Sequence, residues 1–89
     1  MYILGNTIYF RSIPEMFDKE KTIVKPNTER FLRPCEEAML KAADDITHIH
    51  IENTDTGESF IRELTDITPF KFYDVCNTHY IFSWKHVED

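Results

Sequence analysis

The segment from residue 44 to residue 66 places alternating apolar and polar side chains on both sides of a turn at Gly57. Ile49 and Ile51 fall on one face of an extended chain, and the polar residues between them fall on the other. Gly57 readily adopts the left-handed backbone conformation that a loop of three to five residues requires. The segment therefore predicts a β-hairpin.

The hairpin also concentrates negative charge. Residues 44–66 contain seven carboxylates and one arginine. Residues 1–43 carry six acidic and seven basic side chains, a balance of about +1, whereas residues 44–89 carry ten acidic and three basic ones, about −7. An asymmetry of this kind indicates a surface that meets a cationic partner.

Two short segments near the N-terminus also have the character of strands. Gly5-Asn6 suits a tight turn, which predicts a hairpin between the short apolar runs on either side. Residues 22–25 are rich in β-branched side chains and predict another short strand.

A first helix is expected between these strands. Ser12 and Glu15 have the spacing of a capping box, which predicts a helix that runs to about Glu20. Ile13 and Phe17 are four residues apart, so both are expected on its inner face.

The main helix is predicted over residues 28–43. Pro34 lacks an amide donor and fits only the first turn of a helix, so the regular part is expected to begin near Arg33. One apolar stripe is expected to face the core, formed by Phe31, Cys35, Met39 and Ala43.

The C-terminal part predicts a connection and a last strand. Pro69 disfavours strand pairing, so residues 66–77 are expected to form a connection with a short helical turn. Residues 78–85 predict a strand with Tyr80, Phe82 and Trp84 on one face.

These elements mix helices and hairpins without regular βαβ alternation. The pattern predicts an α+β fold with a mainly antiparallel sheet, one main helix and one or two short helices. At 89 residues, the chain is expected to form a small single domain over residues 1–89.

Composition narrows the cellular setting. The N-terminus does not resemble a signal peptide, and no apolar run approaches the length of a membrane span. Cys35 and Cys76 form no paired motif. We therefore expect a cytoplasmic protein with reduced thiols, without a membrane partner.

The leading functional prediction is a small acidic binding protein without enzymatic activity. Its carboxylates would select a basic protein surface and its aromatics would anchor it. Such a protein would be suited to inhibit or regulate a nucleic-acid-handling protein. Self-association, in which the basic half of one chain meets the acidic half of another, is a variant of this prediction. The predicted contact residues are Glu52, Asp55, Glu58, Glu63, Tyr80, Phe82 and Trp84.

A first alternative uses the basic N-terminal half, where aromatic residues lie between cationic ones. Charge and stacking together can bind nucleic acid or a nucleotide. The net charge of −6 argues against general affinity for nucleic acid, so this partner is less favoured. The candidate residues are Arg11, Lys21, Lys25, Arg30 and Arg33.

A second alternative is a metal-dependent enzyme or sensor. His48 and His50 project from the same face of one strand and could supply two metal ligands, although a site needs a third. The sequence contains none of the common catalytic or nucleotide-binding motifs. We therefore expect no cofactor, and binding rather than catalysis.

Overall fold

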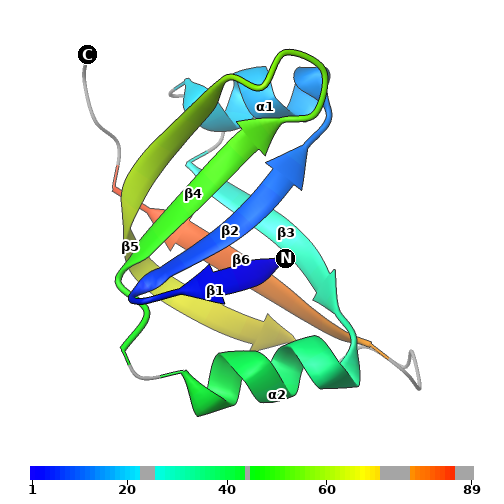
Figure 1. Cartoon of the computed structure of the whole chain (residues 1–89), viewed down its shortest axis with the longest axis vertical. Coiled ribbons are helices and arrows are strands. Elements are labelled where there is room, and N and C mark those ends of the chain that lie inside the picture. Colours follow the sequence, from blue (N-terminus) through cyan, green and yellow to red (C-terminus); the bar gives the residue numbers. More distant parts are fainter. Residues whose placement is uncertain (23–25, 44, 71–76, 86–89) are drawn as a thin grey trace.

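A computed structural model describes residues 1–22, 26–43, 45–70 and 77–85. These residues form a mixed sheet of six strands and two helices, which agrees with the α+β class (Figure 1). The sheet order is β1-β2-β4-β5-β6-β3, with β2 and β4 parallel and the other neighbours antiparallel. The elements are β1 (Tyr2–Leu4), β2 (Thr7–Ser12), α1 (Pro14–Lys21), β3 (Asn27–Leu32), α2 (Pro34–Ala42), β4 (His48–Asn53), β5 (Ser59–Phe70) and β6 (Thr78–Trp84).

The predicted acidic hairpin is present as β4 and β5. Ile49 and Ile51 are fully buried, as the alternation predicts. Gly57 has a φ of +74°, and the Asn53 amide donates to the Glu58 carbonyl at 2.7 Å across the loop. The predicted N-terminal hairpin is confirmed as well, because β1 and β2 pair around Gly5 at a φ of +60°.

Strand β5 belongs to both halves of the sheet. Its first part pairs with β4 and its second part with β6, and the register shifts between Leu64 and Asp66. A bulge of this kind bends a strand. The prediction of a connection over residues 66–77 is therefore wrong as far as Phe70. Pro69 is tolerated because no described strand pairs with the other edge of β5 there. Residues 71–76 lie outside the described part.

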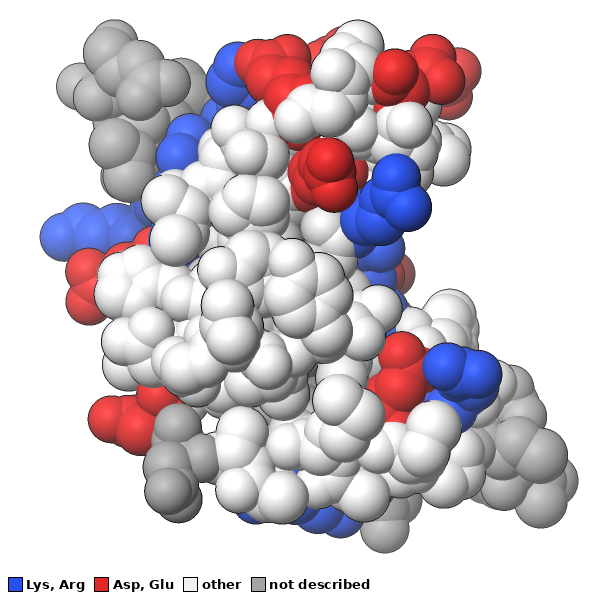
Figure 2. Space-filling view, in the orientation of Figure 1, with Lys and Arg blue, Asp and Glu red and all other residues white. Residues whose placement is uncertain are grey.

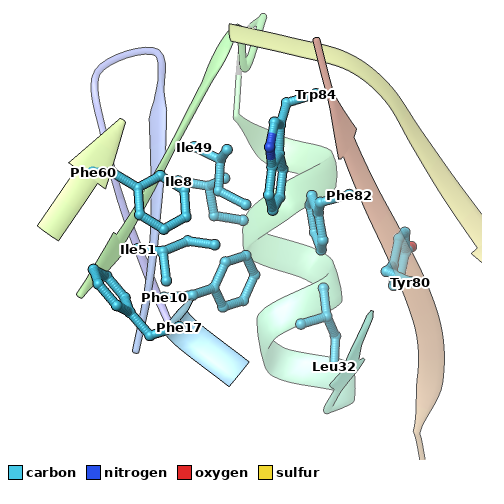
Figure 3. Packing of buried hydrophobic residues seen from close by; sticks show 10 residues of the cluster. All are labelled: Ile8, Phe10, Phe17, Leu32, Ile49, Ile51, Phe60, Tyr80, Phe82 and Trp84. Atoms are coloured by element: carbon cyan, nitrogen blue, oxygen red, sulfur yellow. The ribbon is translucent and has the colours of Figure 1, made fainter. Parts of the chain in front are cut away.

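The bend folds the sheet around a single aromatic core. Figure 1 shows β1, β2 and β4 in front of β6 and β3, with α1 and α2 at opposite ends. Figure 3 shows the buried side chains of both halves meeting between them. Phe10 of β2 lies 5.0 Å from Phe82 of β6, and Phe60 lies 5.3 Å from Phe17 of α1, measured between ring centroids. The core consists of Ile8, Phe10, Phe17, Leu32, Ile49, Ile51, Phe60, Tyr80, Phe82 and Trp84.

The C-terminal aromatics are therefore part of the core. Tyr80 and Trp84 are each 5% exposed, and Phe82 is fully buried. Their predicted role as partner contacts is corrected, because the bend of β5 turns this face of β6 toward β2 and β4.

The main helix is shorter than predicted. Residues 27–32 form β3, and the helix begins at Pro34, where the proline was expected to mark its start. A residue before proline favours the extended backbone, and Arg33 has it, with a φ of −68° and a ψ of 160°. The predicted buried stripe is wrong: Phe31 and Met39 are exposed, and so is Cys35.

Helix α1 occupies its predicted place but has a different start. Ile13, and not Ser12, is the residue that precedes the helix, and no side chain caps it. Phe17 is buried as predicted, whereas Ile13 is exposed. Thr22 ends this helix, and the rest of the strand predicted over residues 22–25 lies outside the described residues. Neither helix in the described part of the chain is long and apolar enough to cross a membrane.

Two carboxylates at the start of α2 secure this helix. The backbone amide of Arg33 donates to Glu36 at 3.0 Å and lowers the pKa of that carboxyl. The Thr78 hydroxyl of β6, together with Lys41, holds the pKa of Glu37 below its ordinary value of 4.5. Its neighbours on α2 and β6 therefore favour the charged form of Glu37.

Removing a core ring should test the burial of the C-terminal strand. We expect Phe82→Ala to lower the free energy of unfolding by about 3–5 kcal/mol, because it opens a cavity among packed rings. Leu4→Ala, at a side chain that is 66% exposed, should change it by about 0.5 kcal/mol or less. Urea titration followed by the fluorescence of Trp84 measures both. Equal effects would contradict this core.

Acid should weaken the attachment of α2. Because the folded pKa of Glu37 is lowered, its contribution is complete above pH 4.5 and is lost as pH falls through the folded value. We expect Glu37→Gln to lose less stability than the wild-type chain between pH 7 and pH 3. Thermal melts followed by circular dichroism measure this difference. An identical pH dependence in both proteins would refute the role of this carboxylate.

Candidate functional site

A pocket opens between β2, α1 and β3. Its volume is about 210 Å³. Each of the three elements contributes polar groups to it, and Met16 of α1 and the preceding Ile13 add an apolar wall. The lining residues are Arg11, Ser12, Ile13, Met16, Glu20, Thr28, Glu29 and Arg30.

Glu20 is the most unusual of these residues, because it is a carboxylate with 1% exposure. It follows Phe17 by three residues on α1, so both side chains share the helix face that packs on the sheet. The Ser12 hydroxyl donates to Glu20 Oε1 at 2.6 Å. The second oxygen, Oε2, accepts no hydrogen bond from a described residue and lies 3.9 Å from Arg30 Nη2.

Arg30 supplies the balancing charge from β3. Its Nε donates to Thr28 Oγ1 at 3.0 Å, Nη1 to the Arg11 carbonyl at 2.8 Å and Nη2 to Ser12 Oγ at 2.5 Å. The guanidinium also lies 4.9 Å from the centre of the Phe10 ring. Burial lowers the pKa of Arg30, and the charge of Glu20 opposes that shift.

The sheet explains why the Arg11 carbonyl accepts this bond. β1 has only three residues, and its pairing with β2 ends at Tyr9. Beyond that point the outer edge of β2 has no strand beside it among the described residues, and Arg30 occupies the edge. The Arg11 side chain points the other way, is 68% exposed, and reaches Glu52 at 3.7 Å.

The structure thus brings together two of the five predicted nucleic-acid-binding residues, Arg11 and Arg30. Lys21 instead forms an ion pair with Glu58 at the hairpin loop, and Arg33 pairs with Glu36 at 3.2 Å beside α2. Lys25 lies outside the described residues. Sequence reasoning missed Ser12, Glu20 and Thr28 as pocket residues. An acidic residue at a core-facing position of α1 was the available signal.

The predicted acidic surface is partly neutralised by the chain itself. Glu52 pairs with Arg11, and Glu58 pairs with Lys21. Asp55 and Glu63 form no ion pair with any described residue. The four carboxylates therefore do not act as one free anionic patch.

The histidine pair stays on the outward face of β4. The His48 ring nitrogen Nδ1 lies 2.7 Å from the Thr47 hydroxyl, and the His50 ring packs 4.8 Å from the Tyr9 ring. Within the described residues, no three histidine, cysteine, aspartate or glutamate side chains come close enough to hold a metal ion. The metal-site prediction thus gains no third ligand from the described part of the chain.

Comparisons with known proteins add no assignment. No protein-family model, no curated protein and no solved structure matches the chain.

Breaking the buried pair from one side should reveal its energetic role. We expect Arg30→Met to destabilise the fold by about 3–5 kcal/mol, because Glu20 then remains buried without a counter-charge. Arg33→Met removes an exposed arginine and should cost about 1 kcal/mol or less. Urea titration at pH 7 measures both variants.

A second variant separates charge from packing. Adding Glu20→Gln to Arg30→Met should recover part of the lost stability, because the uncompensated charge is gone. If the double variant is as unstable as the sum of the single ones, the two side chains do not act as a pair.

Proposed function

We propose that the chain binds a nucleotide unit in the pocket between β2, α1 and β3. One observation carries the proposal: the same pocket is lined by Glu20, whose buried oxygen Oε2 has no hydrogen bond from a described residue, and by Arg11, whose side chain is exposed. The first accepts a hydrogen bond from an N–H group, and the second attracts an anion.

The inner part of the pocket suits a nucleobase edge. Glu20 Oε2 is buried and has no hydrogen-bond donor among the described residues, so the side chains around it would have to move before a ligand N–H group donates to it, as cytosine donates to carboxylates. The hydroxyls of Ser12 and Thr28 are held by Arg30, so the polar wall is already ordered before a ligand arrives. Ile13 and Met16 supply apolar contacts. A flat ligand with N–H donors therefore meets complementary groups.

Arg11 is the cation that we assign to a phosphate, and its side chain would turn from Glu52 toward the pocket to reach it. Arg11 is held by an exposed ion pair with Glu52, and such pairs contribute little to stability. Its guanidinium can therefore turn to a phosphate at small cost, with bidentate geometry. Arg30 is less suited to this role because three of its five N–H groups donate to the protein itself and its side chain is only 22% exposed.

Net charge limits the length of the ligand. A chain at −6 repels an extended polyphosphate backbone. One nucleotide, free or at an exposed position of a single strand, brings few phosphates and satisfies both ends of the pocket. The sequence predicted, as an alternative, that five cationic residues bind a nucleotide. The proposed site uses only Arg11 of these five as a ligand contact, together with the Glu20–Arg30 pair.

Amide chemical shifts should locate the ligand. In titrations with AMP, GMP, CMP and UMP at low salt, we expect at least one to shift the amides of Ser12, Met16, Glu20 and Thr28. The full chain labelled with ¹⁵N is the sample. Shifts confined to other elements, or no saturable shift with any of the four, would reject the pocket.

Substitutions of two arginines distinguish binding at the pocket from attraction by the overall charge of the chain. Arg11→Ala should weaken the nucleotide about tenfold, as the loss of about 1.4 kcal/mol from one phosphate contact implies. Arg33→Ala removes the same charge from the start of α2 and should leave the affinity unchanged. Equal losses in both variants would mean that binding depends only on net charge.

A further inference from the structure

A second surface lies on the face of β1, β2, β4 and β5 that is turned away from the core. The strand register aligns Tyr2, Tyr9, His50 and Ile61 in one row across these four strands. We call these three aromatic residues, together with Ile61 at the end of the row, the aromatic row. The Tyr2 and Tyr9 rings stack with centroids 4.5 Å apart and an angle of 7°, and His50 continues the contact at 4.8 Å.

The aromatic row is accessible. Tyr2 is 56% exposed and Ile61 is 50% exposed, and the neighbouring Leu4 of β1 is exposed as well. Figure 2 shows a broad area without charged side chains over these strands. Exposed apolar surface with a polar margin is typical of an interaction site. Stacked aromatics suit such a site because tyrosine gives much contact area with few rotamers to fix.

The margin of this face is acidic. On one side of the aromatic row, Glu63 lies opposite His48 in the strand register. On the other side, Glu52 lies opposite Arg11. The Arg11–Glu52 ion pair balances one of these charges, and Glu63 forms no ion pair with a described residue. Asp55 in the hairpin loop is likewise without an ion pair there. Arg62 lies between Ile61 and Glu63 and donates to the Ile61 carbonyl, so it offsets one of these two carboxylates, and the remaining charge is negative, as is that of the whole chain at −6.

We propose that this face docks a protein whose contact surface presents an apolar or aromatic side chain inside a margin of lysine or arginine. The apolar centre would pack on the aromatic row, and the cations would meet Glu63 and Asp55. Complementary charge raises the rate of encounter and excludes acidic competitors. A second copy of this chain fits less well, because it would bring the same acidic margin against itself.

The docking face is independent of the nucleotide pocket. Arg11 lies at the boundary of both, so substitutions of Arg11 are not used to test the face. Ile61 and Tyr2 do not line the pocket. Loss of docking with normal nucleotide binding, or the reverse, therefore distinguishes the two proposals.

Site-directed crosslinking should identify the partner. We would introduce a photo-crosslinking phenylalanine analogue at position 61, or at position 31 as a control, in the full chain within its native host. Phe31 is 60% exposed and belongs to β3. Position 61 should capture a basic protein that position 31 does not, identified by mass spectrometry.

The purified pair then tests the chemistry. We expect Ile61→Asp to weaken binding of the captured protein at least tenfold, and Glu63→Lys to slow association and reduce its salt dependence. Phe31→Ser should bind as the wild-type chain does. Leu4→Asp repeats the test at a second exposed site, and near-ultraviolet circular dichroism verifies that every variant is folded.

Several results would overturn the proposal. Crosslinks from position 61 to the chain itself, with a dimer mass by light scattering, would assign the face to a second copy. Capture of the same proteins from both positions, or of none, would remove the docking role. An acidic captured protein, or one indifferent to Ile61→Asp, would reject the stated partner chemistry.

Discussion

The guanidinium of Arg30 is the contact on which the arrangement of this protein depends. It joins β3 to the unpaired edge of β2 and stands beside the buried carboxylate of Glu20 on α1. Without it, a charged group would remain in the interior and the end of β2 would lack a neighbour. Since removal of one partner from a buried pair costs more than the pair contributes, the three elements are held to one geometry.

That geometry has two consequences for the surface. Between β2, α1 and β3 it leaves a pocket lined by the buried Glu20 and by Arg11, whose side chain is exposed. On the opposite side of β2 it leaves a four-stranded face whose centre is aromatic. We propose that the pocket takes a small ligand with both N–H donors and negative charge, and that the face docks a protein. Arg11 lies where these two surfaces meet, and its pairing with Glu52 leaves it available to either.

Local patterns predicted the local elements well. The alternation around Gly57 identified the hairpin, and Pro34 marked the start of α2. The errors came where tertiary contacts decide the outcome. Residues 28–32 match a helical stripe, yet β6 provides a pairing partner and makes them a strand. Pro69 disfavours strand pairing in general, but it lies in a part of β5 with one unpaired edge. In both cases the deciding partner is far away in sequence.

The same limit applies to the candidate sites. The sequence by itself determined the net charge, the acidic character of the hairpin, the side chains that alternate on each strand, and the turns at Gly5 and Gly57. It could not determine which face of a strand is covered. The bulge near Leu64 bends the sheet, so Tyr80, Phe82 and Trp84 became core while Tyr2 and Ile61 stayed outside. Only the tertiary structure decided these placements, because burial depends on which strands meet across the bend.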